Sequence, residues 1–153
     1  MPSTMPSDPI LAAAFATASA HDGFGSVESS IDCVRCSAKH AGAPAHFELQ
    51  RRGDVYWVRM VTSDRWLSES VEGEILEGDP LDELLEEELA DLGWRGTIGA
   101  LKHFRDEQKV YVYEHQVPAN STHSAAESAA LFLIAYAKTF HELGDMSSGA
   151  GDA

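Results

Sequence analysis

Lysine, asparagine and cysteine are scarce in this chain, and each shortage limits what the protein can be. Four of the 153 residues are lysine, one is asparagine and two are cysteine. Lysine and arginine together number 11 against 25 acidic residues, which gives a formal net charge of -14. An acidic surface repels phosphate, so neither nucleic acid nor an anionic membrane is expected as a partner. A basic protein partner suits this charge better.

Long apolar runs are also missing. Spanning a bilayer takes about 20 apolar residues, and the longest apolar segment, residues 129–137, is far shorter. Two cysteines separated by two residues do not make the disulfide framework of a small secreted domain. We therefore expect no membrane association and a cytoplasmic location. Hydrophobic residues make up 44% of the chain, which is enough to bury one core at this length.

Hydrophobic periodicity predicts an α+β domain with the element order α-βββ-α-ββ-α. Residues 47–51 and 55–61 are typical of two strands joined by a turn. Residues 66–76 carry a weaker alternation, which permits a third strand. Residues 97–104 and 110–115 then form a hairpin. These segments together predict an antiparallel five-stranded sheet.

Three helices are predicted from capping residues that precede apolar residues at helical spacing. The first covers residues 10–20, and the second begins with Pro80 at its first helical position. The third is long and packs on the sheet. Because residues 129–137 are apolar nearly all round, this helix needs cover on more than one side, and a second subunit could supply it. A homodimer is therefore expected. The residues predicted to begin and end the helices are the N-caps Asp8 and Asp79, the capping box Ser124 and Glu127, and the C-terminal stops Gly93 and Gly144.

Composition outside these elements predicts flexible ends around one domain. Residues 1–9 are rich in proline and serine and are expected to be disordered, and residues 145–153 form a Gly/Ser/Ala tail. Residues 10–144 make a single α+β domain. Within it, residues 21–30 are predicted to be a loop and residues 33–46 a Cys/His loop.

The Cys/His loop carries the one motif that suggests chemistry. Cys33, Cys36, His40 and His46 form the pattern Cys-x2-Cys-x3-His-x5-His. Two thiolates and two imidazoles are the right ligand types for tetrahedral zinc. Alternatively, the two thiols act in redox chemistry, with Arg35 lowering a thiol pKa. The third interpretation is a pair of reduced cysteines with no further role. The protein accordingly needs either no cofactor or one zinc ion.

Tryptophan supplies the candidates for partner contacts. Trp66 and Trp94 lie at the edges of predicted elements, and Arg95 follows directly. Tryptophan and arginine are enriched in binding hot spots. Trp57 lies in the middle of a predicted strand and is expected in the core. Because the sequence contains no nucleophile elbow, metalloprotease helix or nucleotide-binding loop, the main hypothesis is a non-enzymatic, acidic protein-binding module.

Two segments and the acidic charge support a family resemblance. The segments are Pro80–Leu85 as the middle helix and Ala129–Phe140 as the closing helix. With the element order over residues 10–143, the chain resembles the small acidic bacterial chaperones of type III secretion and the related sensory-transduction-regulator domain. The resemblance implies a twisted antiparallel sheet backed by helices, often dimeric, that binds a partner without catalysis. It assigns no site residues.

Overall fold

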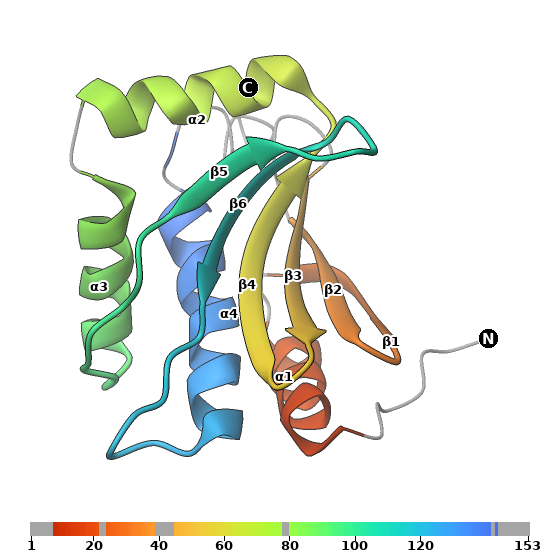
Figure 1. Ribbon diagram of the computed structural model, residues 1–153, viewed down its shortest axis with the longest axis vertical. Helices are drawn as coiled ribbons and strands as arrows, with labels where there is room; N and C mark the ends of the chain where they lie inside the picture. Colours follow the sequence, from red (N-terminus) through yellow and green to blue (C-terminus); the bar gives the residue numbers. More distant parts are fainter. Residues whose placement is uncertain (1–7, 22–23, 39–44, 78–79, 142, 144–153) are drawn as a thin grey trace.

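The structure is a computed structural model that describes residues 8–21, 24–38, 45–77, 80–141 and 143. These residues form four helices and six strands (Figure 1). The helices are α1 (Pro9–Ala20), α2 (Arg65–Glu77), α3 (Leu81–Asp91) and α4 (Ala125–His141). The strands are β1 (Phe24–Ser30), β2 (Cys33–Ala38), β3 (Ala45–Arg52), β4 (Val55–Thr62), β5 (Lys102–Arg105) and β6 (Tyr111–Gln116).

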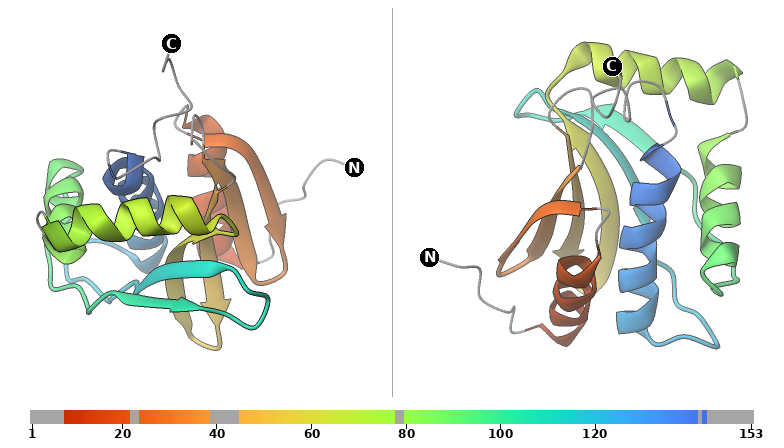
Figure 2. Two further views of the ribbon diagram at one scale, coloured as in Figure 1. Left: turned by 90° about the horizontal axis from the view of Figure 1, so that it is seen from above. Right: turned by 180° about the vertical axis from the view of Figure 1, so that it is seen from behind.

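All six strands belong to one antiparallel sheet with the spatial order β1-β2-β3-β4-β6-β5. Helices α1 and α4 pack on one face, as the view from behind shows (Figure 2). Helix α3 lies beside α4, and α2 crosses one end of the sheet. No described helix covers the opposite face, which we call the open face. The protein is therefore an α+β fold in which the C-terminal helix packs on an antiparallel sheet.

The prediction of five strands is wrong, because β1 and β2 form where loops are predicted. In β2, Val34 and Cys36 are fully buried while Arg35 is exposed, which is the alternation of a half-buried strand. The cysteine motif obscures this pattern in the sequence. Strand β1 is an edge strand that pairs with β2 alone and contains a bulge between Phe24 and Val27. An edge position tolerates the glycine and serines that favour a loop prediction.

The predicted third strand over residues 66–76 is also wrong, because α2 occupies this segment. Leu67, Val71 and Ile75 recur every four residues, and the first two are buried. The Asp64 carboxylate accepts a hydrogen bond from the Leu67 backbone N–H at 2.8 Å, as an N-cap does. The observed order is therefore α-ββββ-αα-ββ-α.

The other helix signals agree with the structure except at the start of α3, where Pro80 is the N-cap and the helix begins one residue later than predicted, at Leu81. Asp8 caps α1 by accepting hydrogen bonds from the N–H groups of Ile10 and Leu11 at 2.8 and 3.0 Å. Gly93 follows α3 with a φ of +87°, a left-handed conformation that suits glycine. Ser124 and Glu127 form the predicted capping box, with hydrogen bonds of 2.9 and 3.1 Å. Asp79, Gly144 and the segments 1–7 and 145–153 lie outside the described residues.

Helix α4 is the centre of the core, and it is covered within one chain. Phe132 meets Trp94 edge to face, with ring centroids 4.9 Å apart, and Phe140 lies against Tyr113 of the sheet. Helices α1 and α3 pack along the remaining sides of α4. The apolar circumference that predicts a second subunit is thus satisfied by the sheet and two helices of the same chain. None of the described helices is long and apolar enough to cross a membrane.

Candidate functional site

The structure does not bring together the members of the Cys/His motif that it describes. Side chains of a strand alternate between its faces, so Cys33 and Cys36, three residues apart on β2, point to opposite faces. Cys36 is fully buried in the core, whereas Cys33 shares the open face with His46 of β3. In the register of β2 and β3, His46 pairs with Ser37 and lies four positions along from Cys33, about 13 Å at strand spacing. His40 lies outside the described residues.

The two thiols lack the environment of a redox pair. Burial, reinforced by the Glu48 carboxylate, raises the pKa of the Cys33 thiol to about 12. The guanidinium of Arg35 opposes this shift, but its Nε binds Glu48 at 2.8 Å. Burial likewise raises the pKa of the Cys36 thiol to about 12. Both cysteines therefore stay protonated at neutral pH, whereas a nucleophilic thiol needs a lowered pKa.

The three candidate partner anchors lie in different surroundings. Trp66, in the first turn of α2, is 74% exposed, and Arg95 is exposed in the connection that follows α3. Trp94 is only 2% exposed and donates its indole N–H to Ser128 Oγ at 2.9 Å. Trp94 is consequently part of the core, and Trp66 is the exposed tryptophan of the pair.

One row of charged residues crosses the open face at right angles to the strands. Each pair of neighbouring strands places an acidic residue directly opposite a basic one. Opposite charges at opposed positions attract, and a slip of one residue would turn a member to the other face. The row therefore favours a single register across the sheet. Its members, in the spatial order of the strands, are Glu28, Arg35, Glu48, Arg59, Glu114 and Lys102; we call them the charge row.

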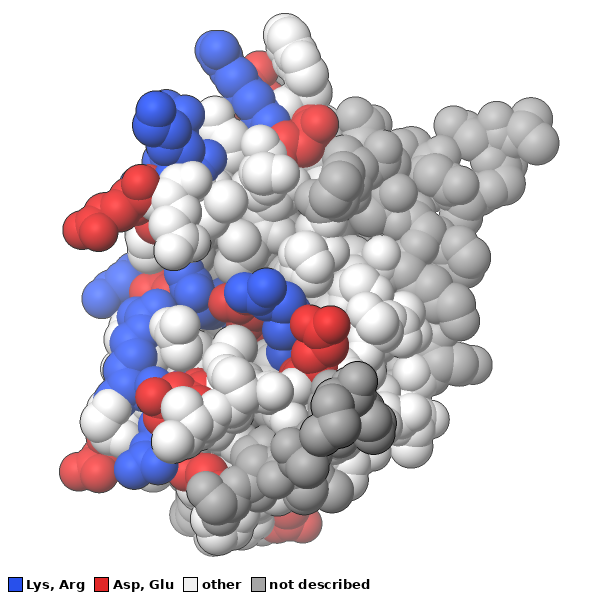
Figure 3. Space-filling view, turned by 90° about the vertical axis from the view of Figure 1, so that its right-hand side faces the viewer, with Lys and Arg blue, Asp and Glu red and all other residues white. Residues whose placement is uncertain are grey.

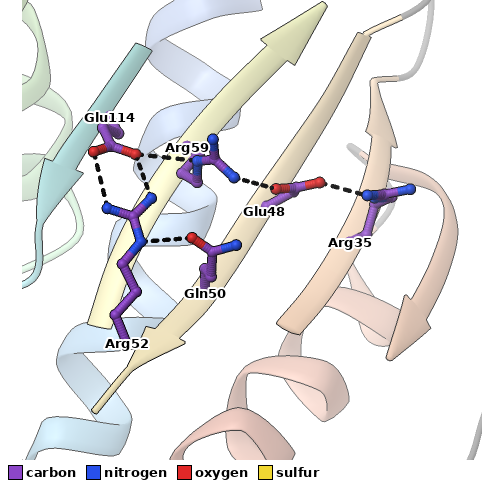
Figure 4. A network of polar contacts seen from close by, with 6 residues as sticks. All are labelled: Arg35, Glu48, Gln50, Arg52, Arg59 and Glu114. Atoms are coloured by element: carbon purple, nitrogen blue, oxygen red, sulfur yellow. Dashed lines mark hydrogen bonds and ion pairs between the residues drawn. The ribbon is translucent and has the colours of Figure 1, made fainter. Parts of the chain in front are cut away.

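The inner members of the charge row are joined by ion pairs (Figure 4). Arg59 donates from Nη1 to Glu48 at 3.0 Å and from Nε to Glu114 at 3.1 Å. The side chains of Glu48, Arg59 and Glu114 are only 5%, 11% and 2% exposed. Buried charges are tolerated only when paired and hydrogen-bonded, and here each inner charge has at least one partner of opposite sign.

A cluster of two cations and one aromatic ring includes the Lys102 end of this row. Arg52, at the end of β3, binds Glu114 through both terminal nitrogens at 2.7 and 3.1 Å, and its Cζ lies 5.0 Å from the centroid of the Trp57 ring. Lys102 stands opposite Glu114 in the register of β5 and β6, yet its Nζ lies over the same ring, 4.7 Å from the centroid. We call Arg52, Trp57 and Lys102 the cation–tryptophan cluster.

The open face does not share the strong acidity of the chain. Its strands place four basic and three acidic side chains there, whereas the whole chain has 11 basic and 25 acidic residues. In Figure 3 this face is seen along the left side, where lysine and arginine gather. The acidic excess lies elsewhere, largely on α2 and α3. An anionic group therefore meets less repulsion on the open face than the net charge of the whole chain implies.

On the covered side of the sheet, two histidines each bind a carboxylate from a helix. His115 of β6 is fully buried; its Nε2 lies 2.5 Å from Asp82 of α3, and its Nδ1 lies 2.6 Å from the Tyr136 hydroxyl of α4. Burial lowers the pKa of His115, although the hydrogen bond to Asp82 opposes the shift. The neutral ring therefore donates from Nε2 to Asp82 and accepts from Tyr136 at Nδ1. His103 of β5 lies 2.5 Å from Glu72 of α2 in the same manner. These contacts fasten helices to the sheet.

No protein-family model matches the chain, and no curated protein or solved structure matches it either. The candidate site is therefore defined by the open face itself. Sequence reasoning misses this face, because it assigns Trp57 to the core, whereas the strand alternation places Trp57 on the open face with partial exposure. One signal is present in β3, where Glu48 and Gln50 alternate with the apolar residues Phe47 and Leu49 on the core side. That alternation marks a polar face but not its partners on other strands.

Proposed function

We propose that this protein is a non-enzymatic binding module for another protein, chaperone-like or regulatory, and that the open face of its sheet is the contact surface. The observation that carries the proposal is the exposed cation–tryptophan cluster on a sheet face that no described helix covers. Tryptophan and arginine are the residues most enriched in binding hot spots, and a sheet holds them in fixed positions. The buried ion pairs beside the cluster add rigidity, because their partners come from four different strands.

The arrangement of a twisted antiparallel sheet backed by helices supports the chaperone-like form of the proposal. Relative to the pattern of the type III secretion chaperones and the sensory-transduction-regulator domain, this chain has one further strand and one further helix. The added strand widens the open face at its β1 edge. The family assignment accordingly belongs to the proposal and rests on architecture alone.

Self-association and location form part of the same proposal. Since α4 is covered within its own chain, a homodimer would use another surface, and the open face is the first candidate. Cys33 and Cys36 project from opposite faces of one strand, so they do not pair with each other, which suits a reducing cytoplasm.

Site-specific photo-crosslinking in the source cells tests the function. A benzophenone amino acid is placed at Gln116, an exposed residue that pairs with Trp57 on the open face. The same amino acid is placed at two comparison positions. One is Trp66, the exposed tryptophan on α2, and the other is Lys138, which is exposed on α4 behind the sheet. We expect a discrete adduct at Gln116, and none at Lys138.

The mass of the adduct identifies the kind of partner. An adduct of twice the chain mass, with a dimer in light scattering, would identify a second copy, and any other discrete mass a different protein. Adducts at Trp66 alone would move the contact surface to α2 and contradict the assignment of the open face. Absence of adducts at all three positions, with a monomer in light scattering, would contradict the binding function.

A further inference from the structure

We propose that the cation–tryptophan cluster binds a carboxylate group on an acidic side chain of the partner protein. The inference rests on the proposed function and adds the chemistry of the partner at one point of the open face. The sequence predicts a basic partner from the net charge of the whole chain. At this cluster the local charge has the opposite sign.

The first step concerns Lys102, whose charge is not matched by a described carboxylate. Glu114 is its opposite neighbour, but the Glu114 carboxylate already accepts three hydrogen bonds, two from Arg52 and one from Arg59. Two guanidinium groups thus share this one carboxylate. The Lys102 ammonium lies over Trp57 instead, and Lys102 is an exposed residue.

The second step concerns Arg52, which keeps donors for a ligand. A guanidinium has five N–H groups, and Arg52 uses three of them, two toward Glu114 and one toward Gln50 at 2.7 Å. Its side chain remains 39% exposed. Each terminal nitrogen therefore retains one N–H, and either of these can donate a single charge-assisted hydrogen bond to a carboxylate oxygen.

The third step concerns the ring between the two cations. Arg52 Cζ and Lys102 Nζ lie 5.0 and 4.7 Å from the Trp57 centroid, so two positive groups lie beside one ring on a partly exposed surface. A carboxylate at this ring is attracted by both cations. The Trp57 ring meanwhile offers an apolar surface to the methylene groups of an aspartate or glutamate side chain.

The range of electrostatic forces favours an acidic segment of a protein over a nucleic acid. At physiological salt the Debye length is about 8 Å, so a single carboxylate at the cluster responds mainly to nearby charges. These are Arg52, Lys102 and the Glu114 carboxylate that Arg52 binds, and their sum is positive. A nucleic acid carries a phosphate every few ångströms and would extend over the acidic surface of α2 and α3. A short acidic motif avoids that repulsion.

Nuclear magnetic resonance titration of the full chain tests the inference. The probe is acetyl-Glu-Glu-Glu-amide, with acetyl-Gln-Gln-Gln-amide as the neutral control and inorganic phosphate at equal ionic strength as a second anion. We expect the acidic peptide to shift the Trp57 indole and Lys102 amide signals, and the neutral peptide to leave them in place. Lys102→Gln should weaken peptide binding about threefold to fivefold, as loss of one exposed ion pair does. Lys138→Gln makes the same charge change on α4 and should leave binding unaltered.

Three results would overturn the inference. They are the absence of shifts with the acidic peptide, equal shifts with phosphate, and equal weakening by Lys102→Gln and Lys138→Gln. Both variants alter exposed side chains, so retained dispersion of the spectrum shows that each remains folded. If Gln116 still forms cross-links while the acidic peptide fails to bind, the carboxylate site is wrong and the binding function stands. If neither is observed, both proposals fail.

Discussion

The face of the sheet beneath α1 and α4 and the open face behind it are built from alternate residues of the same six strands. On the covered face, Leu49, Val58 and Met60 are fully buried among helix side chains. On the open face, the neighbouring positions hold Glu48 and Arg59, which are also buried and form an ion pair with each other. Apolar burial stabilises in proportion to area and has little directional preference. An ion pair contributes less net stability but depends strongly on geometry.

This difference separates two tasks within one sheet. The covered face supplies most of the stability, and the charge row favours one register over its neighbours. The open face is then free of helices and can present side chains to a partner. The following predictions compare the two faces, starting with the largest expected effect.

Truncating an aromatic side chain in the core on the covered side should lower the free energy of unfolding more than any other change considered. Phe132 is fully buried and packs edge to face against Trp94. Phe132→Ala should lower the free energy of unfolding by about 3–5 kcal/mol, because it removes apolar contacts and leaves a cavity. Urea denaturation measures the loss. The matched control is Phe104→Ala on the open face, where Phe104 is 39% exposed; we expect a loss below about 1 kcal/mol. Equal losses would contradict the division between the faces.

Removing one member of the charge row should cause the next largest loss in the free energy of unfolding. Glu114→Leu removes the carboxylate that Arg52 and Arg59 share, and should cost about 3 kcal/mol, as loss of one partner in a buried ion pair does. Adding Arg59→Met removes the buried cation as well. The double variant should therefore be more stable than the sum of the two single losses predicts. Strictly additive losses would show that the two residues do not act as a pair.

The third prediction concerns the pH dependence of stability. It tests the hydrogen bonds by which His115 of β6 contacts α3 and α4. Burial lowers the pKa of His115 from its ordinary value of 6.5, so the unfolded chain takes up this proton more readily than the folded one. Stability should fall as the pH drops through about 6.5 and level off below the folded pKa. In His115→Gln, which removes the titratable ring and keeps a polar side chain, this part of the pH dependence should vanish. Urea denaturation at pH 8, 7, 6 and 5 compares the two proteins. Identical dependence of the free energy of unfolding on pH in both would contradict this role of His115.

The smallest effect is expected from metal removal. Cys33 and Cys36 lie on opposite faces of β2, so they do not offer two thiolates to one ion. Protein purified without chelator should contain far less than one zinc per chain by elemental analysis, and chelation should leave the melting temperature unchanged. One zinc per chain that is lost in Cys33→Ser would restore the metal site and require a different arrangement of residues 33–46.

Much of this fold is predictable from local sequence, and the errors have physical causes. Capping residues and apolar spacing locate α1, α3 and α4 closely, because those signals depend on neighbours within one or two turns. The β1 strand escapes prediction because its serines and glycine are acceptable only at a sheet edge, which is a tertiary property. Helix α2 is mistaken for a strand because Leu67 and Val71 alternate with serines as well as recurring every four residues.

The candidate site is less predictable than the fold. Arg59 and Glu114 are 55 residues apart in sequence, and their ion pair exists only because β4 and β6 are neighbours in one register. The position of Trp57 on the open face depends on the same pairing. Cys33 and Cys36 show the converse case. They are close in sequence, but their side chains point to opposite faces of β2. Proximity along the chain is thus a poor guide to proximity in a sheet.

The contact between α1 and α4 has a consequence for biosynthesis. Leu11, Ala14 and Ala18 of α1 leave the ribosome before α4, the helix that packs against α1 and begins only at Ala125. Until that helix emerges, the growing chain holds an apolar helix and one bare side of its sheet without their cover. Such surfaces are the ones on which nascent chains aggregate or recruit helper proteins. The last step of folding must therefore follow translation of α4, when the two distant helices close the core together.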